Sequence, residues 1–193
     1  MAERTSIHIV LEALDPSRGK FHWSLTLFSS HRPPNWSCVD LFQIVDTVAT
    51  TSISDVSSTS SAKSLHSNSL SLPHSVTVKR TWHLAHRRTV DLLSPSRPQA
   101  CVGAVRLPDA DLPYNDLKEF IEEQEAEQGD TETMRGVPWS CAQWLMRVLA
   151  RLMESGLYEL DMNHFYPKIQ RLGIELDRLR LADPNEVHVL DFA

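Results

Sequence analysis

The segment from Phe21 to Phe28 alternates between large apolar side chains and small or polar ones. Its apolar positions are Phe21, Trp23, Leu25 and Leu27, and its polar positions are His22, Ser24 and Thr26. A period of two is typical of a β-strand with one buried face. The segment therefore predicts a strand whose inner side chains belong to the core, and the strand-like run 6–14 before it predicts a hairpin.

Helical patterns appear in the second half of the chain. Apolar residues recur at helical spacing from Trp144 to Met153, and Ser140 and Gly156 are placed to cap the two ends of this helix. Further helices are expected at 113–128 and 164–172, and further strands at 41–48, 75–84, 88–93, 101–107 and 187–192. Strands followed by helices predict an α+β fold, with a small antiparallel sheet packed on a central helix that bears Cys141.

A length of 193 residues suits a single domain, 1–193, better than two, and the 41% of apolar residues is enough for a core. Residues 50–72 differ from the rest, since Ser and Thr dominate and large apolar residues are few. Such a segment buries too little surface to offset its ordering entropy. We expect it to be a mobile insertion between strands.

Charge and cysteine content narrow the class of protein. The formal net charge is −6 with acids and bases mixed along the chain, which argues against a nucleic-acid partner. We find no segment with the pattern of a signal peptide and none of transmembrane length. Three cysteines without CxxC spacing favour reduced thiols, and we expect a cytoplasmic protein with no membrane span.

Cys141 falls in the first turn of the best-defined helix. Free backbone N–H groups and the helix dipole favour negative charge there, so the thiol pKa is expected to fall and an oxyanion can be bound. A cysteine nucleophile also needs a base, and His22, on the polar face of its strand, is the best candidate among nine histidines. Either Asp46 or Gln43, on the next strand, could orient the imidazole; the charge of Asp46 slightly favours it.

Two short segments resemble the signature segments of circularly permuted papain-like (NlpC/P60-type) proteins. They are Phe21-His22-Trp23-Ser24-Leu25 and Trp139-Ser140-Cys141-Ala142-Gln143-Trp144. That group includes the lecithin–retinol acyltransferase-like enzymes and the PPPDE peptidases, and the pattern is most similar to uncharacterised fungal proteins with an HW strand and a cysteine helix. The resemblance covers roughly residues 6–156 and implies a permuted papain-like fold, in which the histidine strand precedes the cysteine helix.

The pattern predicts a cysteine-dependent hydrolase or acyltransferase that acts on an amide, ester or thioester. Cys141 would be the nucleophile and His22 the base, no cofactor would be needed, and Trp139, Trp144 and Trp23 would contact the substrate, a peptide or a small molecule. Two alternatives stay open: a non-enzymatic binding module on the same fold, and a biosynthetic catalyst that shapes a small molecule without covalent chemistry. Cys38 and Cys101 are expected to be packing residues.

Metal binding is not expected. His83 and His86 resemble a ligand pair, but in a strand their side chains point to opposite faces, and no cysteine or carboxylate completes a set at ligand spacing. The acidic run 122–127 is interpreted as a solvated helix face. The oligomeric state does not follow from the sequence.

Overall fold

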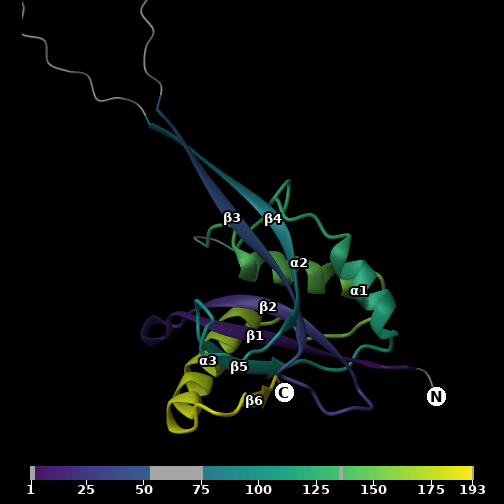
Figure 1. Ribbon diagram of the computed structural model, residues 1–193. Helices are drawn as coiled ribbons and strands as arrows, with labels where there is room; N and C mark the ends of the chain where they lie inside the picture. The colour runs from purple at the N-terminus through teal and green to yellow at the C-terminus, as the bar shows by residue number, and fades with distance from the viewer. Residues whose placement is uncertain (1–2, 53–75, 135–136, 193) are drawn as a thin grey trace, which may run out of the picture.

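The computed structural model describes residues 3–52, 76–134 and 137–192, and these form six strands and three α-helices (Figure 1). The strands are β1 (Thr5–Asp15), β2 (Lys20–Ser29), β3 (Val39–Ser52), β4 (Val76–Val90), β5 (Cys101–Arg106) and β6 (Val189–Asp191). The helices are α1 (Tyr114–Glu122), α2 (Cys141–Glu154) and α3 (Phe165–Ala182), and a 3-10 turn, η1 (Pro16–Arg18), joins β1 to β2.

All six strands form one sheet in the order β4-β3-β2-β1-β5-β6. Neighbouring strands are antiparallel except β5 and β6, which are parallel. The expected hairpin is present, since β1 and β2 pair from Thr5↔Ser29 to Asp15↔Lys20. The α+β class is therefore confirmed, with a mixed sheet in place of the expected antiparallel one.

The junction between β2 and β3 differs from the other antiparallel pairings. Among the described residues these two strands share one registered pair, Leu25↔Phe42. Beyond that pair the ladder ends, and we call the place where β2 and β3 part the seam. The backbone N–H of Trp23 in β2 lies at this seam and bonds to a side chain instead of to β3.

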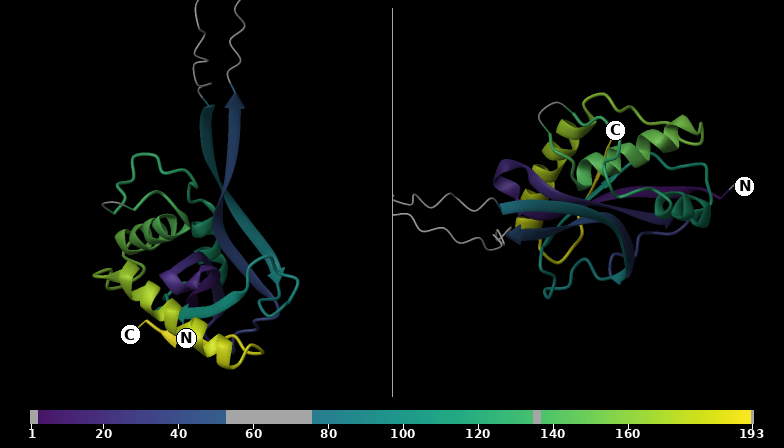
Figure 2. Two further views of the ribbon diagram at one scale, coloured as in Figure 1. Left: turned by 90° about the vertical axis from the view of Figure 1, so that its left-hand side faces the viewer. Right: turned by 90° about the horizontal axis from the view of Figure 1, so that it is seen from above.

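Strands β3 and β4 continue past the body of the molecule as a twisted two-stranded ribbon (Figures 1 and 2). They pair from Val39↔Val90 to Ser52↔Val76. Two strands, 75–84 and 88–93, were expected where β4 is one, and the ladder with β3 continues through residues 85–87 between them. Residues 50–52 of the expected insertion belong to β3, and residues 53–72 lie outside the described residues.

The three helices pack against one face of the sheet, which we call the helix face (Figure 2). Helix α2 contacts β2 and β3, α1 contacts β2, and α3 contacts β5 and β2. Phe21, Trp23 and Leu25 of β2 point to this side and join the main core. The alternation predicted for this strand is thus confirmed.

The opposite face is covered by loops and by the segment before β6, and we call it the loop face. His8, Val10 and Glu12 of β1 lie opposite Thr26, Ser24 and His22 of β2 on this side. A smaller apolar cluster covers part of the face, and its buried members are Val10, Val39, Leu41, Leu92, Ala104 and Val187. Unlike the helix face, the loop face therefore holds buried polar side chains between apolar ones.

Helix α1 ends at Glu122, although a helix was expected to continue to residue 128. Past its end, the backbone carbonyls of residues 125–127 accept hydrogen bonds from side chains of α2 and of the residues before it. The Trp144 indole donates to the Glu125 carbonyl, the Trp139 indole to that of Ala126, and Arg147 to that of Glu127. These distant partners hold residues 125–127 in the irregular segment that follows the helix.

Helix α3 runs to Ala182, beyond the expected end at residue 172. Gly173 lies inside it and allows the helix to approach β2 closely, because a Cβ atom there would lie 2.5 Å from Cε2 of Phe21. The last strand, β6, is shorter than expected and spans Val189–Asp191.

Candidate active site

Cys141 is the first residue of α2, as predicted, and Ser140 is its N-cap. The Ser140 hydroxyl accepts a hydrogen bond from the Gln143 amide at 3.5 Å. The helix ends at Glu154, with Ser155 as C-cap and Gly156 following in a left-handed conformation (φ 75°). Cap residues and apolar spacing thus place the thiol at the start of a helix whose inner face is buried.

The thiol of Cys141 lies against the seam. The backbone N–H of Trp23 donates to Sγ of Cys141 at 3.4 Å. This N–H is available because β2 does not pair with β3 at that position. Cys141 is 9% exposed, so most of the residue is shielded from solvent.

His22 and Gln43 are joined by a short hydrogen bond. His22 Nε2 lies 2.8 Å from Oε1 of Gln43, and the Ser24 hydroxyl donates to the same oxygen at 2.7 Å. An amide oxygen carries no proton, so Nε2 of His22 is the protonated nitrogen. Nδ1 then keeps its lone pair, as a general base requires.

Asp46, the other residue expected to orient the imidazole, has a different partner. Its carboxylate pairs with the Arg80 guanidinium of β4 at 3.0 Å. Its charge still acts on the site, since it raises the pKa of His22 and of Cys141. Gln43 therefore makes the direct contact with His22, and Asp46 acts through space; the catalytic part of each stays a prediction.

Burial raises the pKa of the Cys141 thiol, and the Asp46 carboxylate adds to this effect. The backbone N–H groups of Trp23, Ala142 and Cys141 act in the opposite direction. The sequence led us to expect a lowered pKa from the helix start alone. Desolvation outweighs the helix N–H groups, and the resting group is a thiol.

Burial also lowers the pKa of His22 below its usual 6.5, with a further decrease from the Arg87 charge. The hydrogen bond to Gln43 and the charge of Asp46 oppose the decrease. The imidazole is therefore neutral at pH 7. The site pairs a neutral thiol with a neutral imidazole, and not a thiolate with an imidazolium.

No hydrogen bond joins His22 to Cys141 among the described residues. The two are brought together by β2, because His22 directly precedes Trp23, whose N–H contacts the sulfur. The His22 side chain alternates with those of Phe21 and Trp23, which point to the helix face. Thiol and imidazole thus approach the same stretch of β2 backbone from its two sides, at the seam.

The tryptophans expected to contact a substrate are buried. Trp144 is fully buried, Trp23 is 2% exposed and Trp139 is 7% exposed. Their rings belong to the main core, and the indoles of Trp139 and Trp144 are hydrogen-bonded to backbone carbonyls. Substrate contact by these residues stays a prediction, and this fold gives them little surface for it.

Two residues that lie near the site, Ser24 and Tyr166, were not assigned from the sequence. Ser24 shares the Gln43 oxygen with His22, and its place two residues along the same polar face could have indicated this. Tyr166, in the first turn of α3, stacks on Trp23 with 5.3 Å between ring centroids. Burial raises the pKa of Tyr166, and the nearby Cys141 raises it further. Nothing in the sequence links α3 to the thiol.

The other expected absences concern metals and membranes. His83 lies 3.0 Å from the Thr47 hydroxyl, while His86 contacts the carboxylates of Asp40 and Glu122, so the two rings have separate partners. Within residues 3–52, 76–134 and 137–192, no three His, Cys, Asp or Glu side chains gather as a metal site. In the same ranges no helix has the length and apolar character needed to cross a bilayer.

Comparisons with protein-family models, with curated proteins and with solved structures find no match to this chain.

Proposed function

We propose that the chain is a cysteine-dependent hydrolase or acyltransferase with a permuted papain-like arrangement. One observation carries the proposal: the Cys141 sulfur contacts the backbone of Trp23, the residue that directly follows His22 in β2. Trp23 N–H donates to the Cys141 sulfur, and the His22 ring is fixed by Gln43 with Nδ1 unprotonated. The order of a histidine strand before a cysteine helix agrees with the resemblance seen in the sequence.

The chemistry follows from two neutral groups. As Sγ of Cys141 bonds to the acyl carbon, its proton passes by way of a water molecule at the seam to Nδ1 of His22, because the two side chains approach β2 from opposite sides. The carbonyl oxygen becomes an oxyanion, which the backbone N–H at the start of α2 can bind. The imidazolium then protonates the leaving alcohol, amine or thiol. Water, or another acceptor, releases the acyl group from sulfur and restores the thiol.

The test uses p-nitrophenyl acetate, an activated ester that reports acyl transfer without knowledge of the natural substrate. The expected result is a burst of nitrophenolate and one acetyl group on Cys141, located by mass spectrometry of peptides. His22→Ala should slow acetylation by about 10²–10⁴-fold, the usual contribution of a general base. Gln43→Ala should slow it less, because it frees the ring without removing the base.

Cys38→Ser and His83→Ala are matched controls at other positions, and both should acetylate like the wild type. Cys38 is exposed and His83 lies on the ribbon. The rate should rise with pH through the lowered pKa of His22 and then level, because only the neutral imidazole accepts a proton. Acetylation of Cys38 alone, or an unchanged rate in His22→Ala, would contradict the proposal and favour a binding module.

A further inference from the structure

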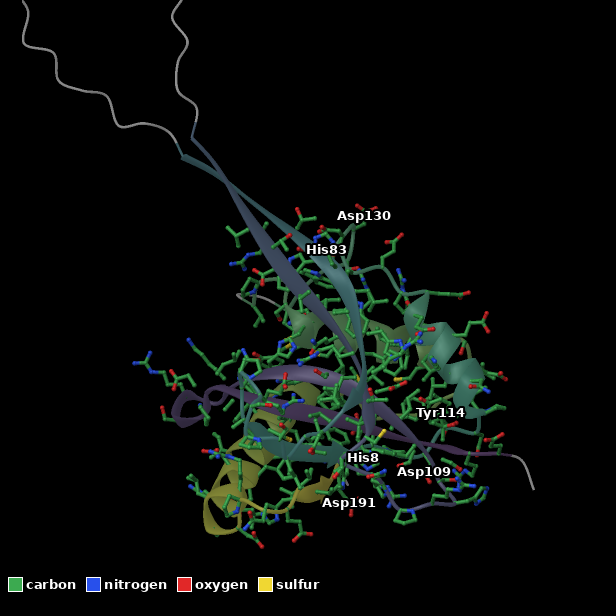
Figure 3. The ribbon with its side chains drawn as sticks, viewed as in Figure 1. His8, His83, Asp109, Tyr114, Asp130 and Asp191 are labelled. Carbon is green, nitrogen blue, oxygen red and sulfur yellow. The ribbon has the colours of Figure 1, made fainter. Side chains whose placement is uncertain are left out.

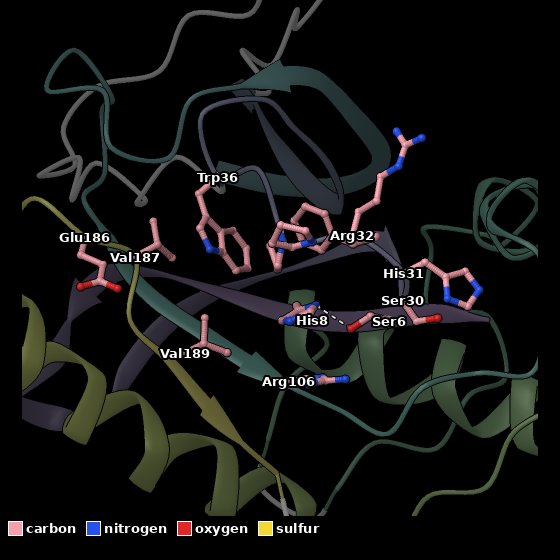
Figure 4. A pocket seen from close by; sticks show the side chains of 13 residues that line it. Ser6, His8, Ser30, His31, Arg32, Trp36, Arg106, Glu186, Val187 and Val189 are labelled. Atoms are coloured by element: carbon pink, nitrogen blue, oxygen red, sulfur yellow. Dashed lines mark hydrogen bonds between the residues drawn. The ribbon is translucent and has the colours of Figure 1, made fainter. Parts of the chain in front are cut away.

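A cavity of about 590 Å³ opens on the loop face, and no residue of α1, α2 or α3 lines it (Figure 4). Its walls come from segments far apart in the sequence: the start of β1, the loop 30–36, the end of β5 and the segment 186–189. A volume of this size is in the range that holds a small organic molecule. None of the residues assigned to the proposed thiol chemistry lines it.

Three rings form one side of this cavity. His8 packs edge-on against Phe28 and Trp36, with centroids 5.3 and 5.4 Å away, and Phe28 and Trp36 pack edge-on against each other at 5.0 Å. Val187 and Val189 lie across from Trp36 (Figure 4). Rings held in fixed orientations by one another, facing aliphatic side chains, define a slot that suits a flat apolar molecule.

The floor of the cavity is polar although it is buried. Ser6 is 5% exposed and His8 is 2% exposed, and both line the cavity. The Ser6 hydroxyl and Nδ1 of His8 are 3.5 Å apart, and among the described residues the His8 ring has no other hydrogen bond. Buried polar groups are normally well paired. This pair can offer both a donor and an acceptor to a molecule in the slot.

Charge at the cavity favours an uncharged molecule. Arg106 is bonded to both oxygens of Asp109, so its charge is already compensated. Arg32 and Glu186 at the rim are exposed and opposite in sign. Burial lowers the pKa of His8 to about 4, so the floor is neutral at pH 7. A charged group placed on this floor would lose hydration without gaining a partner.

We propose that this cavity is a binding site for a small, flat, uncharged heteroaromatic compound that presents a hydrogen-bond donor and acceptor on one edge to Ser6 and His8. The site is separate from the thiol site and does not depend on its chemistry. Bound compound would lie between Trp36 and the valines, with its polar edge on the floor.

The test measures binding of three bicyclic probes by chemical-shift titration of the Trp36 indole N–H. Carbostyril is neutral with a donor and an acceptor on one edge, quinoline has the acceptor alone, and quinaldate is charged. Carbostyril should give a saturable shift. Quinoline should bind several-fold more weakly for want of one hydrogen bond, and quinaldate about tenfold more weakly or worse because its charge would be buried.

Variants locate the site. Ser6→Ala should weaken carbostyril binding about fivefold, and His8→Phe, which keeps a ring of similar shape, by about tenfold. His83→Phe is the matched control, since His83 lies on the ribbon away from His8 (Figure 3), and it should bind like the wild type. Cys141→Ser should also bind normally, which separates this proposal from the thiol chemistry.

The folded state of each variant is checked by its amide spectrum, and Ser6→Ala removes a single oxygen if His8→Phe fails to fold. No saturable shift with carbostyril overturns the proposal. Equal affinity for quinaldate, or unchanged affinity in both Ser6→Ala and His8→Phe, overturns it as well.

Discussion

The two faces of the sheet differ in the elements that cover them and in the polar groups that they bury. The helix face is an apolar core in which polar groups, such as the indole nitrogens of Trp139 and Trp144, have backbone partners. The loop face holds buried polar side chains, such as His8 and Glu12, under irregular segments. Helices cover a sheet with continuous apolar surface, whereas loops leave a cavity. Stability should therefore depend more on the first face, and ligand selectivity on the second.

The largest expected effect tests whether the helix face contributes more to stability than the loop face, and it concerns Trp144, which is fully buried on the helix face. Trp144→Ala should lower the free energy of unfolding by about 3–5 kcal/mol, through lost burial and a cavity. Trp36→Ala, on the partly exposed wall of the loop-face cavity, is the control and should cost far less. Urea titrations of both variants measure the difference. Equal losses would mean that the loop face is as much a core as the helix face.

The second prediction concerns the loop face, where the buried His8 should make the stability of the fold depend on pH. The pKa of His8 is about 4 in the folded state because of burial and Arg106, with Asp109 opposing, and about 6.5 when unfolded. Between these values the unfolded chain binds a proton that the folded chain does not. Stability should therefore fall as pH decreases from 6.5 to 4, by about 3 kcal/mol.

His8→Phe cannot bind that proton and should lose less stability over the same interval. Denaturant titrations at pH 7 and pH 4 on both proteins give the difference directly. An equal loss in both proteins would show that His8 is not the residue responsible.

The smallest expected effect concerns Gly173, where α3 packs closely against Phe21 of β2. Gly173→Ala should destabilise the fold by about 1–3 kcal/mol, because its Cβ would lie 2.5 Å from the ring of Phe21. Phe21→Leu shortens that side chain, so the double variant should lose less than the sum of the two single variants. Thermal unfolding of the four proteins measures the coupling. Strict additivity would show that α3 moves away from the sheet at little cost.

Secondary structure that depends on neighbouring residues could be predicted from the sequence. The alternation of Phe21–Phe28 predicted the strand of His22, and the capped apolar pattern after Ser140 predicted the helix of Cys141. The early end of α1 did not follow, because the residues after it are held by tertiary contacts: Trp144 and Arg147, about twenty residues away, bond to the carbonyls of Glu125 and Glu127. The direction of the Cys141 pKa also differed, because burial is a tertiary property.

The loop-face cavity could not be predicted from the sequence either, because tertiary structure forms it: its walls bring residues 6–8 together with residues 186–189. A signal was present, however: Ser6, His8 and Glu12 alternate with Ile7, Ile9 and Leu11 in β1. These polar residues lie on a face of β1 that the structure buries, and two of them, Ser6 and His8, line the cavity.

The hydrogen bond from Trp23 to sulfur gives the molecule an internal reporter. The amide proton of Trp23 is hydrogen-bonded to the Cys141 sulfur, so its resonance depends on the electron density of that atom. Ionisation, acylation or alkylation of the thiol should each move the amide resonance of Trp23 by a different amount. One resonance of the backbone can thus follow the chemical state of the Cys141 sulfur.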